Sequence, residues 1–282
     1  MLSLATVAKI VKTRRKIAWL DNTLVKHPNV RIHVSGDCRN DCDRLALSAG
    51  TRTVEQDEID ELGYTSDARL PLEPWRPITR EEHVLLASKT RPQFSDNFIN
   101  VFKLPPILDS QRDLIARNDE GTIRDQIVRP LSSLCHFGEP LHVIGVGIRP
   151  PNARTLTTDH RTGKRVGLHV DSWDGIDLCA RRRATNRLCL NIGESDRFFL
   201  FLPYLLTEIV QIVNAGLDES PMKSFEQTFM ERYANVPVIR CRLSPGEAYI
   251  APTENLIHDA SSEGEKTADV NFTIRGEIEL LQ

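Results

Sequence analysis

The chain has 282 residues, a formal net charge of -3 and ordinary fractions of apolar and charged residues, enough for one large domain or two small ones. The near-neutral charge and low aromatic content exclude a strongly basic, base-stacking surface, so we expect no nucleic-acid partner. No apolar run is long enough for a membrane-spanning helix, and the N-terminal basic cluster follows an apolar run, the reverse of a secretory signal. We therefore expect a cytoplasmic protein without a membrane partner.

The first 75 residues have mixed patterning. Residues 5–20 favour a helix with a basic face, residues 30–34 a short strand, and residues 55–62 an acidic helical turn or two. The proline-rich stretch 70–77 is typical of a linker, because each proline disfavours helix at the residue before it. These patterns predict an N-terminal extension, residues 1–75, packed on a core domain of residues 76–282.

Six cysteines are spread along the chain in a pattern unlike a disulfide scaffold. Cys38 and Cys42 have the spacing of half a zinc site, but no second pair of ligands lies nearby, so we favour free thiols.

Helices are expected before the middle of the chain. Thr79 and Glu82 form the pattern of a capping box, which opens a helix over residues 79–88. Residues 109–134 favour a longer helix with an interruption near Gly121. Amphipathic helices that precede a β-rich segment are expected to pack against the outside of its sheet.

From residue 141 onward the pattern is that of short strands separated by turns. Strands are expected at 141–149, 165–171, 186–192, 197–202, 238–243, 248–251 and 270–279. Two helical segments, 204–215 and 224–233, interrupt this series. Many short strands with turn residues between them favour a β-sandwich or jelly roll.

Three residues have the types and spacing of a metal site. His169 and Asp171 are two apart on a predicted strand, so both side chains point to the same face. His258 follows a Pro-Gly turn, a short strand and a loop much later in the chain. Two histidines and one carboxylate form the facial triad that holds non-haem Fe(II) and leaves its opposite face open for dioxygen and a co-substrate.

The predicted strand after His258 carries Arg275. Its polar face also includes Thr273, while apolar residues alternate on the other face. A buried arginine without a partner is costly, but it is favourable when it forms a bidentate pair with a ligand carboxylate.

This pattern, His169-Val170-Asp171 followed by His258 and Arg275, resembles that of the Fe(II)- and 2-oxoglutarate-dependent dioxygenases. The resemblance covers residues 140–280 and implies a mainly β fold with flanking helices, built on a double-stranded β-helix (jelly roll) core. It implies that His169, Asp171 and His258 bind Fe(II), that dioxygen binds there too, and that Arg275 and Thr273 bind the far carboxylate of 2-oxoglutarate.

One departure concerns the carboxylate clamp. Arg275 lies further beyond His258 than the family's arginine commonly does, with the extra residues in a predicted hairpin loop. Arg187, on the strand after the first two ligands, is the competing clamp and shares a strand face with Asn191. Trp173 and Asp174 directly follow the first ligands and are expected to border the substrate.

The resemblance implies an enzyme that hydroxylates a C–H bond of a small molecule, an amino acid or a peptide, in the manner of natural-product tailoring oxygenases. Halogenation is disfavoured, because the family's halogenases replace the carboxylate ligand and Asp171 is present. Two alternatives remain open. One is a cupin-like metalloenzyme that does not use 2-oxoglutarate, although the His-x-His pair typical of cupins is absent. The other is a non-catalytic β-sandwich binding module.

Overall fold

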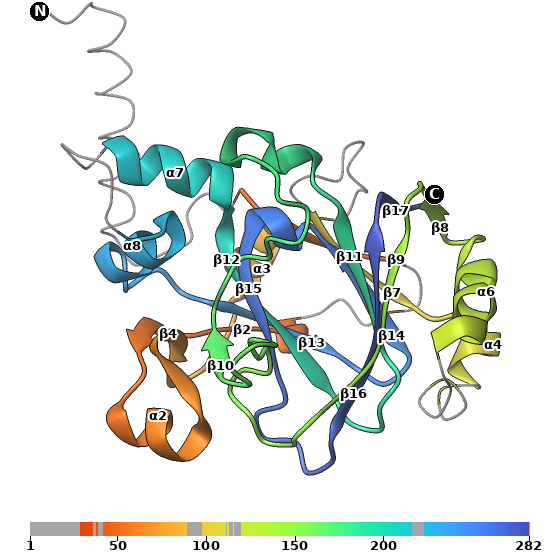
Figure 1. Cartoon of the computed structure of the whole chain (residues 1–282), viewed down its shortest axis with the longest axis horizontal. Helices are drawn as coiled ribbons and strands as arrows, with labels where there is room; N and C mark the ends of the chain where they lie inside the picture. Colours follow the sequence, from red (N-terminus) through yellow and green to blue (C-terminus); the bar gives the residue numbers. More distant parts are fainter. Residues whose placement is uncertain are drawn as a thin grey trace, which may run out of the picture.

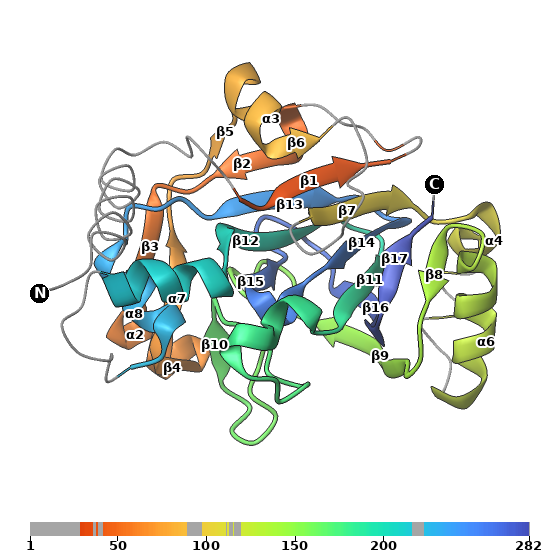
Figure 2. The same cartoon turned by 90° about the horizontal axis from the view of Figure 1, so that it is seen from above.

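Two β-sheets face each other, with helices on both outer sides (Figures 1 and 2). The computed structural model describes residues 29–35, 38, 42–88, 98–110, 112, 115, 120–215 and 223–281. The helix predicted at 5–20 lies outside these residues. None of the described helices is both long and apolar enough to cross a membrane.

The larger sheet has seven strands in the order β6-β1-β7-β14-β11-β16-β9. The strands are β6 (Ala87–Ser88), β1 (Arg31–Val34), β7 (Phe98–Lys103), β14 (Glu247–Ala251), β11 (Asn186–Asn191), β16 (Asp269–Gly276) and β9 (His142–Arg149). The pairs from β7 to β9 are antiparallel, whereas β1 lies parallel to both of its neighbours.

The second sheet has five strands in the order β15-β12-β13-β2-β5. The strands are β15 (Leu256–Ser261), β12 (Arg197–Leu205), β13 (Ile239–Leu243), β2 (Leu45–Leu47) and β5 (Arg76–Pro77). At its edge, His169 forms an antiparallel bridge with His258 of β15. His169 therefore extends this sheet by one isolated bridge, at the position of an eighth jelly-roll strand.

The path of the chain through the sheets defines the architecture. β9, the segment at residue 169, β11, β12, β13, β14, β15 and β16 follow one another in the sequence. Four of them form the order β9-β16-β11-β14, and the other four form 169-β15-β12-β13. This is the strand order of a double-stranded β-helix, an eight-stranded jelly roll. The predicted fold class is confirmed.

Apolar side chains of both sheets form the interior. Cys189 and Tyr249 of the larger sheet pack in one cluster with Phe199, Ile239 and Leu47 of the smaller sheet. Alternation explains this arrangement, since every second side chain of a strand points to the same face.

Helices cover the outward face of each sheet. α4 (Pro106–Asp109) and α6 (Glu120–Leu131) lie outside the larger sheet, where Ile127 and Leu131 pack with Leu188 and Phe272. α7 (Leu206–Ala215) and α8 (Phe225–Arg232) cover the smaller sheet, where Phe229 packs with strand residues. The expected packing of the helix before the β-rich segment is confirmed for α6.

The first third of the chain contributes strands to both sheets, through β1, β7 and β2. The predicted capping box is present at α3 (Arg80–Leu86), and α2 (Gln56–Leu62) matches the acidic helix. The proline-rich stretch differs from the expected linker, because it lies in paired strands, β4 (Tyr64–Leu72) and β5. Pro71 lies near the end of β4, and Pro77 lies in the edge strand β5, positions where a missing backbone N–H is tolerated.

Two small sheets complete the fold. β3 (Gly50–Thr53), β4 and β10 (Arg165–Gly167) form one, and β8 (Cys135–Phe137) with β17 (Ile278–Leu280) forms the other. β10 leads directly into His169.

Candidate metal centre

The two predicted ligand segments are joined through their backbones. His169 N–H donates to the carbonyl of His258 at 3.0 Å, and His258 N–H donates to that of His169 at 2.8 Å. Two residues further on, Asp171 N–H donates to the carbonyl of Thr253 at 3.1 Å. These bonds bring residues that are far apart in the sequence onto neighbouring strands. His258 lies within β15, after the expected turn, short strand β14 and the short helical turn Thr253–Asn255.

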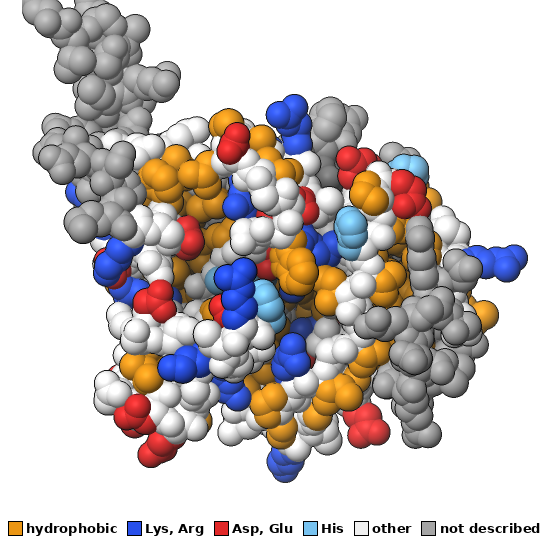
Figure 3. Space-filling model, viewed as in Figure 1, with side chains coloured by type: hydrophobic (Ala, Val, Ile, Leu, Met, Phe, Trp, Pro, Cys, Tyr) orange, Lys and Arg blue, Asp and Glu red, His pale blue; other side chains and the backbone are white. Residues whose placement is uncertain are grey.

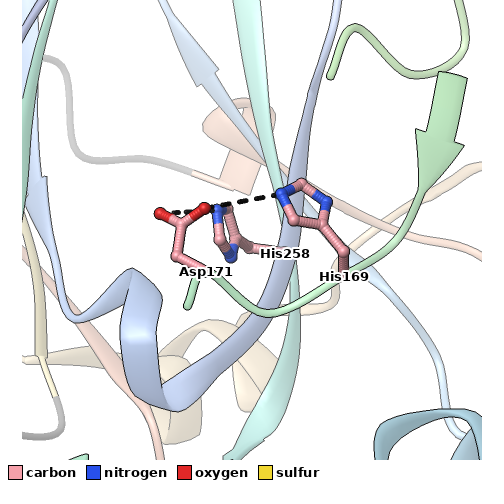
Figure 4. Close-up of side chains that lie close together, drawn as sticks. All are labelled: His169, Asp171 and His258. Carbon is pink, nitrogen blue, oxygen red and sulfur yellow. Dashed lines mark ion pairs between the residues drawn. The ribbon is translucent and has the colours of Figure 1, made fainter. Parts of the chain in front are cut away.

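The three side chains point toward one another (Figure 4). One donor atom from each of His169, Asp171 and His258 lies within 4.8 Å of the others. His169 Nε2 is 3.6 Å from Asp171 Oδ1, and His258 Nε2 is 3.8 Å from Asp171 Oδ2. The structure therefore brings together the three residues that the sequence predicts as ligands.

Hydrogen bonds fix which ring nitrogen of each histidine faces the centre. Nδ1 of His169 lies 2.8 Å from the Gly167 carbonyl, and Nδ1 of His258 lies 2.9 Å from the Leu256 carbonyl. A carbonyl can only accept, so each Nδ1 carries the proton and each Nε2 presents its lone pair. A backbone carbonyl on the second nitrogen is the usual support of a metal-bound histidine.

The two imidazole nitrogens that face the centre have no hydrogen-bond partner. His169 Nε2 and His258 Nε2 are buried and are not hydrogen-bonded to any described residue, whereas the buried Asp171 Oδ2 is ion-paired with Arg187 at 2.8 Å. Buried polar atoms are nearly always paired, because leaving them unpaired is costly. Two unpaired imidazole nitrogens and a carboxylate that converge on one point fit a divalent metal ion, and their N, N, O chemistry fits Fe(II).

Burial and nearby charges set the protonation of the site. Burial lowers the pKa of His258 to about 3. Burial also disfavours the charged form of His169, but the Asp171 and Asp259 carboxylates outweigh it and raise the pKa of His169. Burial opposes ionisation of Asp171 too, yet Arg187 and the histidines hold the pKa of Asp171 well below its usual value. The carboxylate is therefore ionised and available as a ligand.

Arg187 lies beside the carboxylate ligand. Its Nη2 is 2.8 Å from Asp171 Oδ2, and its side chain is 18% exposed. This position lets Arg187 orient the carboxylate and compensate its charge.

A cavity of about 310 Å³ opens beside the triad. Its wall includes His258 and three residues predicted for cofactor or substrate contact, Arg187, Thr273 and Trp173. Trp173 is 66% exposed and stands at the rim. In Figure 3, histidine, basic and apolar side chains gather near the middle of the face that is shown.

Other predicted residues lie elsewhere. Arg275 is 3% exposed, is bound to Asp174 and Glu254, and is not among the residues that line the cavity. Asp174 accepts hydrogen bonds from the backbone and hydroxyl of Thr185. Asn191 supports a turn, since its amide donates to the carbonyls of Ser195 and Leu243. None of these three lines the cavity beside the triad.

Among the cavity residues that were not predicted from the sequence, Arg197 and Tyr249 carry polar groups suited to binding a ligand. Arg197 begins β12 and is almost fully buried; its Nη1 donates to Cys189 Sγ at 2.6 Å, and its Nε lies 3.1 Å from Asp269 Oδ1. Tyr249, on β14, is 3% exposed. The sequence did contain a signal for Arg197. It is two residues before Phe199 on the same strand, so both side chains point to the same face, and Phe199 lies in the interior.

Comparisons with known proteins add a weak structural similarity. No family model and no curated protein matches the chain. Among solved structures, it is similar to the Kdo hydroxylase KdoO, described as a non-heme Fe(II) alphaketoglutarate-dependent dioxygenase. The structure with alphaketoglutarate and Fe(III) has a TM-score of 0.38 and 13% identity, covering 64% of this chain and 79% of that chain. The structure with cobalt(II) has the same TM-score and identity and covers 64% and 80%. At this level the similarity carries no argument, so the fold rests on the strand order and the site on its geometry.

Proposed function

We propose that this protein is an Fe(II)- and 2-oxoglutarate-dependent oxygenase that hydroxylates a C–H bond. The observation that carries the proposal is the convergence of two buried, unpaired imidazole nitrogens, from His169 and His258, and the ionised carboxylate of Asp171 in a jelly-roll core, beside an open cavity. Three protein ligands on one face leave room for a co-substrate and dioxygen on the other. When bound, iron would activate dioxygen, the oxidant of the hydroxylation, and 2-oxoglutarate would supply the two further electrons that dioxygen needs, leaving as succinate and carbon dioxide.

The other residues of the site hold and orient the three metal ligands. The backbone carbonyls of Gly167 and Leu256 fix the two imidazoles, and Arg187 fixes the carboxylate of Asp171. The apolar interior around Phe199, whose ring centre lies 5.7 Å from that of His258, excludes water from one side of the site. Such support keeps ligands in a productive geometry.

We propose Arg197 as the residue that binds the far carboxylate of 2-oxoglutarate. It lines the cavity, whereas Arg275 is bound to Glu254 and Arg187 to Asp171. Arg197 is paired too, since its Nε lies 3.1 Å from Asp269 Oδ1 and its Nη1 donates to Cys189 Sγ, so its place in the cavity wall is what favours it. Thr273 and Tyr249 also line the cavity and can donate hydroxyl hydrogen bonds, since burial raises the pKa of Tyr249 and keeps it protonated.

The cavity favours a small molecule, an amino acid or a peptide side chain as the substrate, because its volume lies at the lower end of the range for small-molecule sites. Trp173 at the rim supplies an apolar surface for such a substrate. The finer proposal is a tailoring hydroxylation in natural-product biosynthesis.

The test is an anaerobic titration of the purified protein with Fe(II) and then 2-oxoglutarate. We expect a visible charge-transfer band that needs both additions and is lost in His258→Ala. The matched control is His160→Ala, because His160 is exposed and lies outside the metal site. No band and no retained metal in the wild-type protein would contradict the proposal and favour a binding module.

The same titration tests the clamp. Arg197→Gln should leave Fe(II) binding unchanged and raise the 2-oxoglutarate concentration at half-maximal band intensity by about tenfold or more, which corresponds to the loss of one charge-assisted pair. An unchanged 2-oxoglutarate requirement would show that Arg197 is not the clamp.

A further inference from the structure

We propose that the buried ion pair between Arg275 and Glu254 positions the metal ligands. The inference rests on the proposed function and concerns residues that do not line the cavity. Their side chains are 3% and 0% exposed, and Arg275 Nη2 lies 2.5 Å from Glu254 Oε1. A charge buried this deeply must be paired, and removing one partner leaves the other uncompensated.

Glu254 links the two segments that carry the ligands. It lies in the 3-10 helix η3 (Thr253–Asn255), directly before β15 and its His258. Its Oε1 accepts a hydrogen bond from the backbone N–H of Trp173 at 2.8 Å, two residues beyond Asp171. The carboxylate therefore ties the chain after one ligand to the turn before another.

Arg181 strengthens this link. It lies in the 3-10 helix η2 (Leu178–Arg183), and its Nη1 donates to the backbone carbonyl of Asp171 at 2.5 Å and to that of Glu254 at 2.7 Å. The same nitrogen lies 3.2 Å from Glu254 Oε2. Both ligand segments are thus fastened to one guanidinium.

Arg275 contacts the segment that follows Asp171, in addition to Glu254. Its Nη2 also lies 3.1 Å from Asp174 Oδ1 and 3.0 Å from Thr185 Oγ1, and its guanidinium lies 5.4 Å from the ring centre of Trp173. Asp174 in turn accepts the backbone N–H of Thr185 at 2.7 Å. The segment 171–174 is therefore held by β16 and by the chain entering β11.

These contacts make the position of Asp171 depend on a charge pair that lies outside both the ligand triad and the cavity wall. A metal site needs its ligands held to within a fraction of an ångström, and outer partners commonly set metal affinity. Arg275 does not line the cavity, and its Nη2 is shared among Glu254, Asp174 and Thr185. The pair is consequently a positioning device, and Arg275 acts through Glu254 and the loop.

The experiment measures Co(II) binding to the metal-free protein by visible absorption, without 2-oxoglutarate. Glu254→Gln removes the charge with little change in volume, and Arg275→Lys keeps the charge but cannot reach Glu254, Asp174 and Thr185 together. Both variants should weaken Co(II) binding by about tenfold or more, as loss of an outer partner does. A second titration, with Fe(II) and then 2-oxoglutarate, is made on each variant at saturating metal. The 2-oxoglutarate concentration that gives half of the maximal charge-transfer band should be the same as in the wild type.

The matched control is Glu247→Gln. Glu247 and Arg44 form another buried ion pair, at 2.7 Å with side chains 9% and 4% exposed, that touches neither ligand segment. We expect a lower Tm in this variant but wild-type affinity for Co(II). Should Glu254→Gln fail to fold, Arg275→Lys gives the same reading, because it retains a charge opposite Glu254.

The experiment distinguishes failure of the proposed function from failure of the positioning role. A wild-type protein that binds no Co(II) would overturn the proposed function. A wild-type protein that binds Co(II), with unchanged Co(II) affinity in folded Glu254→Gln or Arg275→Lys, would overturn the positioning role alone. A raised 2-oxoglutarate requirement in Arg275→Lys alone would instead identify Arg275 as the clamp.

Discussion

At the scale of single residues, the two histidines of the site differ in their response to protons. His258 is neutral at pH 7, because burial lowers its pKa to about 3. His169 is 18% exposed at its side chain, and the Asp171 and Asp259 carboxylates raise its pKa. A protonated Nε2 cannot bind a metal, so protons compete with the metal at His169.

We therefore expect the Co(II) affinity of the metal-free protein to fall as the pH is lowered through the raised pKa of His169. Asp259→Asn removes one of the carboxylates, whose Oδ2 lies 3.9 Å from His169 Nδ1, and lowers that pKa. The variant should keep Co(II) bound to a lower pH than the wild type. Absorption titrations at a series of pH values between about 8 and about 6 check this, and superimposable profiles would refute it.

The triad was predictable from the sequence because its chemistry is local. His169 and Asp171 share a face by parity, and a second histidine completes a known ligand set. The partners of Arg275 were not predictable. The alternation of polar and apolar residues along its strand shows which face the side chain is on, but not which residues it contacts there. Its partner Glu254 lies in a short turn that has no periodic pattern, so nothing marked it as buried.

At the scale of elements, β10 delivers His169 through a glycine that no other residue can replace without strain. Gly167 has φ of 69°, in the left-handed region, and a Cβ there would lie 2.5 Å from the Arg69 carbonyl oxygen of β4. Its own carbonyl accepts the hydrogen bond that orients His169. The close approach of two backbones thus leads directly into the metal site.

Gly167→Ala should destabilise the protein by more than about 1 to 3 kcal/mol, the cost of a strained backbone position. It should also weaken Co(II) binding, because the carbonyl that holds His169 moves. Gly163→Ala is a matched control: Gly163 also has φ of 69°, but nothing lies within 4 Å of a Cβ there. Thermal unfolding and Co(II) titration of both variants separate the clash from the backbone strain. Equal effects would contradict the role of the close approach.

Strand positions were predicted best where apolar and polar residues alternate regularly along the sequence. β9, β11 and β13 fall within a residue or so of their expected ranges. β10 is shorter than expected, since after Gly167 the chain leaves β4 and joins β15. The proline-rich stretch was wrongly expected to be a linker, because its pairing depends on distant partners such as β2 and β3.

At the scale of the whole molecule, helices cover the outer faces of both sheets: α6 packs on the larger sheet, and α7 and α8 pack on the smaller one. Ile127 and Leu131 of α6 are fully buried against the outer face of the larger sheet, on the opposite side from the metal site. Ile127→Ala should lower the free energy of unfolding by roughly 2 to 5 kcal/mol through lost burial and a cavity. Co(II) affinity of the folded protein should not change.

The comparison variant is Val84→Ala on α3, whose side chain is 62% exposed and should change stability by no more than about 0.5 kcal/mol. Denaturant unfolding gives both values. A drop in Co(II) affinity with Ile127→Ala would mean that the outer layer and the site are not independent.

The jelly-roll class was predictable from the number of short strands and from the resemblance at the site. The contribution of the first third of the chain was not, because β1, β2 and β7 join the sheets through long-range pairing. Propensity indicates a strand but not its neighbour, so residues 30–34 could be identified as a strand but not placed between β6 and β7.

The position of β16 has a consequence for synthesis of the chain. β16 lies between β9 and β11, which are made much earlier. Until it emerges from the ribosome, a nascent chain presents unpaired edges on both of these strands. Such edges pair readily with other chains, so shielding of the nascent chain until β16 inserts would protect this protein from aggregation.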